Sequence, residues 1–150
     1  MVSFRIILLI CLATYSTATM AQEGSKDFEQ IKKILFQQQE DWNKGDIDAF
    51  MKAYWNSDEL QFGGANGITR GWQKTLDNYK RGYPDQASMG KLTFVIKDMT
   101  RHSKTVVSLT GSWELERENA IPGGHFLLIW RKIKGEWKIV ADHTSQKANF

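Results

Sequence analysis

Hydrophobic residues recur at helical spacing in three segments of the first half of the chain, and this pattern predicts three amphipathic helices. The first helix begins after Asp27, which can cap it, and runs to about Asn43. The second begins after Asp46, and a glycine-rich loop at 63–67 precedes the third, which begins after Thr69. The apolar stripes of the three helices are Phe28, Ile31, Ile34, Leu35 and Trp42; Ile47, Phe50, Met51, Tyr54 and Trp55; and Trp72, Leu76 and Tyr79.

The period changes to two from Lys91 onward, which predicts β-strands. Apolar and polar residues alternate over 92–97 and 107–115. Residues 125–132 are apolar on both faces, as in a central strand, and a closing strand follows Gly135. Helices followed by long antiparallel strands indicate an α+β fold, in which three N-terminal helices pack on one face of a curved antiparallel sheet.

The closing strand ends in ionisable groups. If its residues alternate strictly, one face carries Trp137, Ile139, Ala141 and His143, and the other carries Lys138, Val140, Asp142 and Thr144. His143 is then expected at the rim of a cavity, where its imidazole can act as a general base or donate a hydrogen bond to a ligand. The alternative is a histidine that closes the core through bonds to the backbone or to a helix. Asp142 is expected to point away, as a surface or interface carboxylate, unless a bulge intervenes.

Residues 1–21 have the features of a secretory signal peptide: one positive charge, a short apolar run and then small residues. Cleavage after Ala18 or after Ala21 fits the small-residue rule, and a lipoprotein signal at Cys11 is the alternative. We therefore expect a secreted or periplasmic protein that has no membrane association after cleavage. The remaining residues, 22–150, form one domain.

Composition argues against several classes of function. The formal net charge of +3 falls by one when Arg5 is removed, and Lys and Arg form no block, so neither nucleic acid nor an anionic membrane is an expected partner. The one cysteine is lost with the signal peptide, which leaves no disulfide and no thiol nucleophile. His102, His125 and His143 are isolated in sequence, so we expect no metal and no cofactor. All six tryptophans remain, which favours a large core or an aromatic-lined cavity for a small organic molecule.

Several side chains are candidates for a site in such a cavity. The aromatic candidates for ligand binding, supplied by the helices, are Tyr54, Trp55, Trp72 and Tyr79, although core packing also explains such stripes. Arg131 shares a strand face with apolar residues. Its planar guanidinium can receive a carboxylate, or its charge can simply reach water at the strand end. Asp58 is a candidate to join His143 in proton transfer.

The order of these elements resembles the nuclear transport factor 2-like (SnoaL-like) superfamily over roughly residues 28–146. The likeness is carried by four pieces of sequence: Asp46-Ile47-Asp48-Ala49-Phe50-Met51, the Gly64 to Gly71 loop, Phe126-Leu127-Leu128-Ile129-Trp130-Arg131-Lys132, and Gly135-Glu136-Trp137-Lys138-Ile139-Val140 with Asp142-His143-Thr144-Ser145. Within the superfamily the chain looks most like the exported bacterial domain-of-unknown-function group that is related to the association domain of calcium/calmodulin-dependent kinase. The resemblance implies a cone-shaped fold and a homodimer that forms through the outer face of the sheet.

Three functions remain open, because the superfamily contains isomerases, dehydratases, cyclases and epoxide hydrolases as well as modules without catalytic activity. The first is binding of a small organic molecule in an aromatic-lined pocket without turnover. The second is a cofactor-free lyase or isomerase that uses His143, with Asp58, as proton-transfer groups. The third is a structural dimerisation module whose own side chains fill the cavity.

Overall fold

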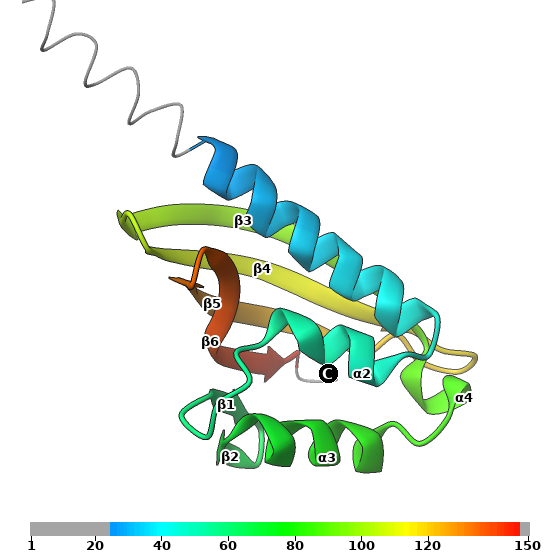
Figure 1. Ribbon diagram of the computed structural model, residues 1–150. Helices are drawn as coiled ribbons and strands as arrows, with labels where there is room; N and C mark the ends of the chain where they lie inside the picture. The colour runs from blue at the N-terminus through cyan, green and yellow to red at the C-terminus, as the bar shows by residue number, and fades with distance from the viewer. Residues whose placement is uncertain (1–24, 148–150) are drawn as a thin grey trace, which may run out of the picture.

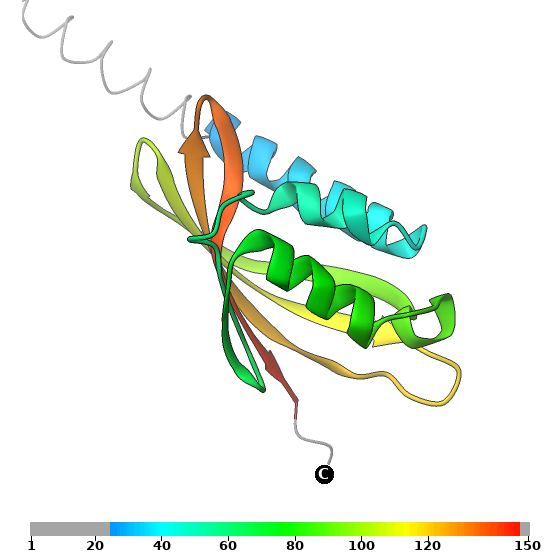
Figure 2. The same ribbon diagram turned by 60° about the horizontal axis from the view of Figure 1, so that its bottom comes forward.

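Helices and a six-stranded sheet form two layers in the computed structural model, which describes residues 25–147 (Figure 1). The helical elements are the first helix (25–43), α2 (Ile47–Phe50), the short 3-10 helix η1 (Met51–Ala53), α3 (Trp72–Gly82) and α4 (Gln86–Met89). Figure 2 shows that the first helix, α2 and α3 lie on the same side of the sheet. The predicted α+β architecture, with helices on one face of a curved sheet, is confirmed.

The sheet has the strand order β2-β1-β6-β5-β4-β3. Its strands are β1 (Gln61–Gly64), β2 (Gly67–Arg70), β3 (Lys91–Ser103), β4 (Val106–Glu116), β5 (Gly123–Ile133) and β6 (Glu136–Gln146). Neighbouring strands are antiparallel except β1 and β6, which run parallel. The glycine-rich segment that was predicted to be a loop instead forms part of the β1–β2 hairpin, which extends the sheet beyond β6.

The second helix is shorter than its apolar spacing predicts. It ends after η1, and Tyr54 is already extended, with φ −82° and ψ 149°. Tyr54 forms a parallel bridge with Ile139 of β6, and the backbone N–H of Trp55 donates to the carbonyl of Ile139 at 2.9 Å. The sheet therefore provides the hydrogen bonds that a continued helix would otherwise supply, and it holds Tyr54 against β6.

Strand β6 changes the face that it presents to the helices part-way along its length. Before the change, Trp137 and Ile139 are the buried side chains. The pairing with β5 then shifts register, and Val140 is left as an extra residue. Beyond this bulge Asp142 is buried and His143 is exposed. One inserted residue moves every later side chain of a strand to the opposite face, because side chains alternate with a period of two.

A buried carboxylate joins the first helix to the sheet. Asp27 accepts hydrogen bonds from Trp137 Nε1 and Lys132 Nζ, both at 3.0 Å, and it is also paired with Arg101. Burial by itself would raise the pKa of Asp27, but the hydrogen bonds from Trp137, Lys132 and Arg101 outweigh it and hold that pKa below its ordinary value. Asp27 is therefore ionised near neutral pH, and it connects β3, β5 and β6 to the start of the helical layer.

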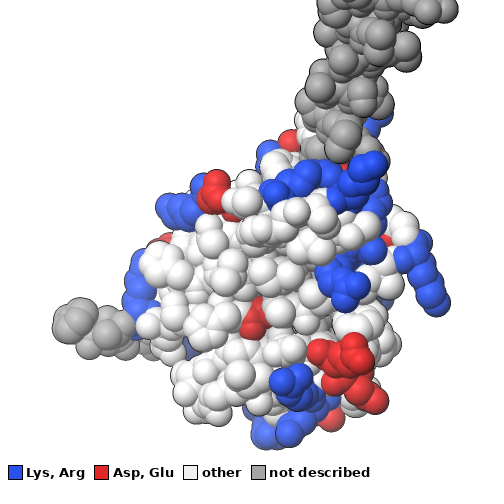
Figure 3. Space-filling view, turned by 90° about the vertical axis from the view of Figure 1, so that its left-hand side faces the viewer, with Lys and Arg blue, Asp and Glu red and all other residues white. Residues whose placement is uncertain are grey.

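The outer face of the sheet, away from the helices, exposes apolar side chains. Leu127 of β5 is 42% exposed, and Val95 of β3 is 45% exposed. Thr110 of β4 and His143 of β6 lie directly beside Leu127 in the register. Figure 3 shows one side of the molecule, on which Lys and Arg side chains gather near the margins and most of the centre is uncharged.

The expected signal peptide, 1–21, lies outside the described residues. Between residues 25 and 147, no helix combines the length and the apolar character that a membrane crossing requires.

Candidate functional site

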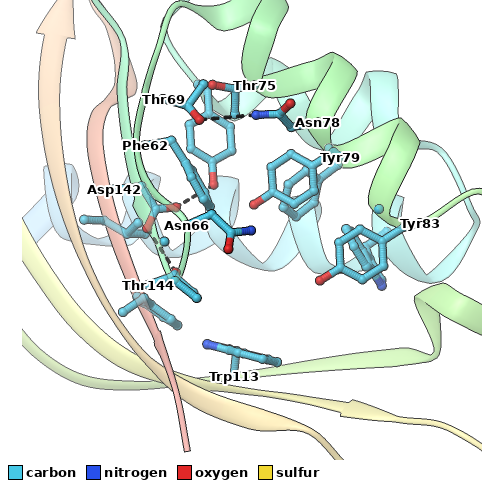
Figure 4. A pocket seen from close by; sticks show the side chains of 18 of the residues that line it. Phe62, Asn66, Thr69, Thr75, Asn78, Tyr79, Tyr83, Trp113, Asp142 and Thr144 are labelled. Atoms are coloured by element: carbon cyan, nitrogen blue, oxygen red, sulfur yellow. Dashed lines mark hydrogen bonds between the residues drawn. The ribbon is translucent and has the colours of Figure 1, made fainter.

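A cavity of about 840 Å³ lies between the helical layer and the inner face of the sheet (Figure 4). Its aromatic lining comprises Trp42, Phe50, Tyr54, Phe62, Tyr79, Tyr83, Phe94, Trp113 and Phe126. Several of these rings pack edge to face; the centroids of Trp42 and Tyr83 are 4.8 Å apart, and those of Phe62 and Tyr79 are 5.6 Å apart. Aromatic rings that contact one another therefore make up a large part of the cavity wall.

The mouth of the cavity is marked by the exposed members of its lining. They come from the β1–β2 turn (Ala65 and Asn66), from β2 (Gly67 and Ile68), from α3 (Lys74, Asn78, Arg81 and Gly82) and from the end of β6 (Gln146). Asn78 Nδ2 donates to Thr69 Oγ1 at 3.2 Å, which joins α3 to the hairpin on one side of the opening (Figure 4). The hairpin and α3 together thus frame the entrance.

Among residues 25–147, Asp142 is the one carboxylate that lines the cavity, and it is only 7% exposed. Tyr54 Oη donates to its Oδ2 at 2.7 Å, and Thr144 Oγ1 donates to its Oδ1 at 3.2 Å. No Lys, Arg or His within residues 25–147 forms an ion pair with it. Burial raises the pKa of Asp142 to about 6, although the hydrogen bonds from Tyr54 and Thr144 act in the opposite direction. Asp142 can therefore gain or lose a proton near neutral pH.

Two tyrosine hydroxyls accompany this carboxylate. Burial, together with the nearby charge of Asp142, raises the pKa of Tyr54 and that of Tyr79 well above the ordinary value. Both phenols are thus protonated near neutral pH and act as hydrogen-bond donors. Figure 4 shows that the hydroxyls of Tyr79 and Tyr83 point into the space between α3 and the strand that carries Asp142 and Thr144.

His143 does not line the cavity, and the expectation that it faces the interior is wrong. It is exposed on the outer face of the sheet, beside Gly63 of β1. A Cβ atom added to Gly63 would lie 2.8 Å from His143 Nδ1, so the absence of a side chain there makes room for the imidazole. The bulge at Val140 is the cause, because it exchanges the faces of His143 and Asp142.

The other sequence candidates divide into two groups. Tyr54 and Tyr79 line the cavity. Trp55 and Trp72 are half-buried outside its lining, and Trp72 Nε1 donates to the carbonyl of Met51 at 3.0 Å. Trp72 therefore has a structural partner that accounts for its polar atom.

Two charged candidates also lie outside the lining. Arg131 is exposed on β5 and does not border the cavity. Asp58 is exposed in the turn between η1 and β1 rather than on a helix, because the second helix ends before it. Neither residue reaches Asp142 or the aromatic walls.

The residues that sequence reasoning missed are polar members of the lining. Gln38 lies three residues after Leu35 and four before Trp42, so it falls on the apolar stripe of the first helix, and this position was the available signal. It is 2% exposed, and its Nε2 has no hydrogen-bond partner within the described part of the chain. No such signal marks Asp142, because both faces of its predicted strand carry apolar residues. In residues 25–147 no cluster of three or more His, Cys, Asp or Glu side chains is placed to hold a metal ion.

Comparisons with known proteins agree with this architecture. A crystal structure from Shewanella oneidensis MR-1, described as an NTF-2-like protein of unknown function, is 38% identical, with a TM-score of 0.77, and the match covers 79% of this chain and 98% of that one. A nuclear transport factor 2-like superfamily protein from Salmonella enterica is 19% identical, with a TM-score of 0.66, over 84% of this chain and 94% of its own.

A ketosteroid isomerase-like protein from Erwinia carotovora is 16% identical, with a TM-score of 0.64, over 81% of this chain and 96% of its own. No protein-family model and no curated protein matches the chain. The similarity to the Salmonella and Erwinia proteins extends to the fold alone.

Proposed function

Because the chain belongs to the nuclear transport factor 2-like family, and because its helices and sheet enclose a cavity, we propose that this cavity binds a small organic molecule with a largely apolar body. One observation carries the proposal: an aromatic-lined space of about 840 Å³ contains a buried carboxylate, Asp142, that has no cation partner within residues 25–147. Ligand sites typically occupy about 300–1,000 Å³ and combine apolar walls with a few polar groups.

The inner polar groups assign an orientation to the ligand. Asp142 accepts a hydrogen bond from a ligand hydroxyl or N–H, and the Tyr79 hydroxyl donates to a ligand oxygen. The aromatic walls contact the rest of the molecule. A purely structural module whose own side chains fill its interior does not agree with a cavity of about 840 Å³.

The proposal is tested by comparing how much small molecule the cavity holds when its mouth is open and when its mouth is blocked. Protein purified from its native host is examined by native mass spectrometry for a small molecule that is released on denaturation. Asn78→Trp places a large ring at the mouth, while Asp77→Trp places the same ring on α3 outside the lining. We expect the adduct in the wild type and in Asp77→Trp, and its loss in Asn78→Trp. Wild-type protein that carries no adduct, and that no compound in a library of apolar small molecules stabilises thermally, would refute the proposal.

A second candidate function is cofactor-free isomerisation or elimination by proton transfer. It is supported by a pKa of about 6 at Asp142, since a carboxylate with such a pKa can take and return a proton at neutral pH. Asp142 takes the role that the sequence assigned to His143. The description of one structural neighbour as ketosteroid isomerase-like is compatible with this chemistry.

Deuterium exchange separates catalysis from binding alone. If Asp142 removes a proton from a carbon of the bound molecule, incubation in D₂O incorporates deuterium at that carbon. Asp142→Asn should then slow the exchange by about 10²–10⁴-fold while the ligand still binds. Binding without any exchange in the wild type would leave a binding protein and exclude the enzyme.

We also propose that two copies pair through the outer face of the sheet. The proposal is supported by the exposed apolar side chains of Val95 and Leu127 on that face. It agrees with the homodimer that the family resemblance implies. The site is not formed from this face, so ligand binding does not require the dimer.

Export is a further proposal, and it rests on the sequence of residues 1–21. A periplasmic or secreted protein with this sequence would fit the exported group to which the chain bears a resemblance. N-terminal sequencing of protein from the native host should find a chain that begins near Thr19 or Gln22. An intact Met1 would contradict cleavage.

A further inference from the structure

Two basic side chains stand at the mouth of the cavity, on the same face of α3. Lys74, Asn78 and Arg81 follow one another at i, i+4 and i+7, so they form a stripe along the helix. All three are exposed members of the cavity lining. Lys74 and Arg81 are separated by about 10 Å along the helix axis. Their long side chains can therefore reach a single group placed near Asn78.

Lys74 and Arg81 differ from the neighbouring Lys80, which has an acidic partner. Lys80, also on α3, forms an ion pair with Asp48 at 2.8 Å. Within residues 25–147, no carboxylate lies at salt-bridge distance from Lys74 or from Arg81. The one acid in the lining, Asp142, is buried inside the cavity rather than at its mouth. The opening therefore carries two cations without a carboxylate partner among the described residues, while the interior contains many aromatic side chains.

We propose that the ligand is an anionic amphiphile: an apolar or aromatic body fills the cavity, and a carboxylate or sulfonate lies at the mouth between Lys74 and Arg81. The inference rests on the proposed binding function and adds the chemical class of the ligand. The planar guanidinium of Arg81 suits a carboxylate because it can donate two parallel hydrogen bonds. Ile68 of β2, which is 70% exposed at the mouth, offers apolar contact to the part of the ligand beside the anion.

This arrangement keeps the ligand's charge away from the buried carboxylate. An anion inside the cavity would oppose the charge of Asp142, whereas an anion at the mouth faces two cations and water. The ligand thus enters with its uncharged end first, and a hydroxyl or N–H on that end can donate to Asp142. Arg131, the anion-binding candidate from the sequence, lies outside the cavity, and α3 supplies the cations instead.

Matched pairs of neutral and anionic probes test the proposal. Binding is measured by isothermal titration calorimetry at pH 7.5 and low salt with phenylacetate, 1-naphthaleneacetate and dodecanoate, each beside its amide. We expect at least one carboxylate to bind about tenfold more tightly than its amide, and this ratio to fall in 0.5 M NaCl. In Lys74→Met/Arg81→Met the ratio should fall to about one, because the carboxylate loses both cations.

The control variant Lys33→Met/Lys80→Met removes the same net charge from sites outside the lining, and it should keep the tenfold ratio. If an amide and its carboxylate bind equally to the wild type, the cavity binds ligands but the anionic class is wrong. If the control loses the ratio as fully as the test variant does, net charge rather than these two residues is responsible, and the proposal is overturned. If no probe of either kind binds, the anionic class is contradicted, while the binding function is decided separately by the adduct and the library screen described above.

Discussion

The Tyr54 hydroxyl donates a hydrogen bond of 2.7 Å to Asp142, a residue 88 positions away in the sequence. Both side chains are buried, and neither is reached by a cation in the described residues. The bond depends on two backbone features: the extended conformation of Tyr54 beside Ile139 and the bulge that follows Ile139 in β6. Asp142 therefore lies in the cavity because β6 pairs first with Tyr54 and then with β1, and bulges between these two pairings.

Asp142→Asn should change the pH dependence of stability. An ordinary aspartate has a pKa of about 3.9 in the unfolded chain, and the pKa of Asp142 in the folded protein is about 6. Between these values the unfolded state ionises first, so the contribution of Asp142 to the free energy of unfolding falls as the pH rises from 4 to 6 and is level above that. The full effect is about 3 kcal/mol. Urea unfolding at pH 4 and pH 7.5 should show Asp142→Asn gaining stability relative to the wild type by roughly this amount.

The control is Asp98→Asn, at an exposed carboxylate of β3. Its stability relative to the wild type should not change in this way between the two pH values. A wild-type protein that gains stability from pH 4 to pH 6 relative to Asp142→Asn would contradict the buried, uncompensated carboxylate.

Tyr54→Phe should raise the pKa of Asp142 above about 6, because the hydrogen bond from Tyr54 favours the ionised carboxylate. We expect an increase of about one unit. The carboxyl carbon of Asp142 can be followed by NMR during a pH titration. Tyr83→Phe serves as the control, because it removes a hydroxyl from the same lining, whereas the Asp142 carboxylate accepts its hydrogen bonds from Tyr54 and Thr144. An unchanged titration in Tyr54→Phe would show that the bond has no energetic consequence.

Gly63→Ala should destabilise the protein through His143. The added Cβ would lie 2.8 Å from His143 Nδ1, so the imidazole must move. We expect a cost of about 1 kcal/mol, most of which disappears when His143→Ala is also present. A double-mutant cycle by chemical unfolding measures this coupling. Additive effects of the two substitutions would contradict the placement of His143 over Gly63.

Asp27→Asn should destabilise the protein at neutral pH by about 2 kcal/mol, because Arg101 and Lys132 lose their common counter-charge. The pKa of Asp27 is lowered in the folded state, so its contribution is present above the ordinary pKa of about 3.9 and is lost as the pH falls toward the folded value. Thermal unfolding from pH 7 down to pH 2.5 should therefore show the wild type and the variant converging. A constant difference over this range would mean that charge is not the cause.

Leu127→Glu should convert the proposed dimer to a monomer, because it places a charge in the apolar part of the outer sheet face. Sedimentation velocity at several protein concentrations should show a dimer dissociation constant that is at least tenfold higher for the variant than for the wild type. Ile121→Glu, at an exposed apolar residue in the loop before β5, is the matched control and should remain dimeric. A wild type that is monomeric at every concentration would refute the pairing.

The sequence alone was sufficient to predict the fold class. The spacing of apolar residues shows which side of a segment is buried, and this information is local. Examples are the helical spacing of Ile31, Leu35 and Trp42 and the alternation along β4. Of the aromatic candidates from the sequence, Tyr54 and Tyr79 line the cavity, and their role in ligand binding stays a prediction. A period of 3.6 in a helix, or of 2 in a strand without a bulge, is a property of the segment itself, and for this reason it can be read from the sequence.

The face of Asp142 was decided only by the tertiary structure. In β6 the residues before and after Val140 pair with different segments, first with Tyr54 and then with β1, and the bulge lies between these pairings. Nothing in the local sequence marks it, since Val140 and Ala141 are both apolar and suit either face. One inserted residue was enough to turn His143 outward and to place a carboxylate in the cavity, because a strand retains its alternation only while its register is unbroken.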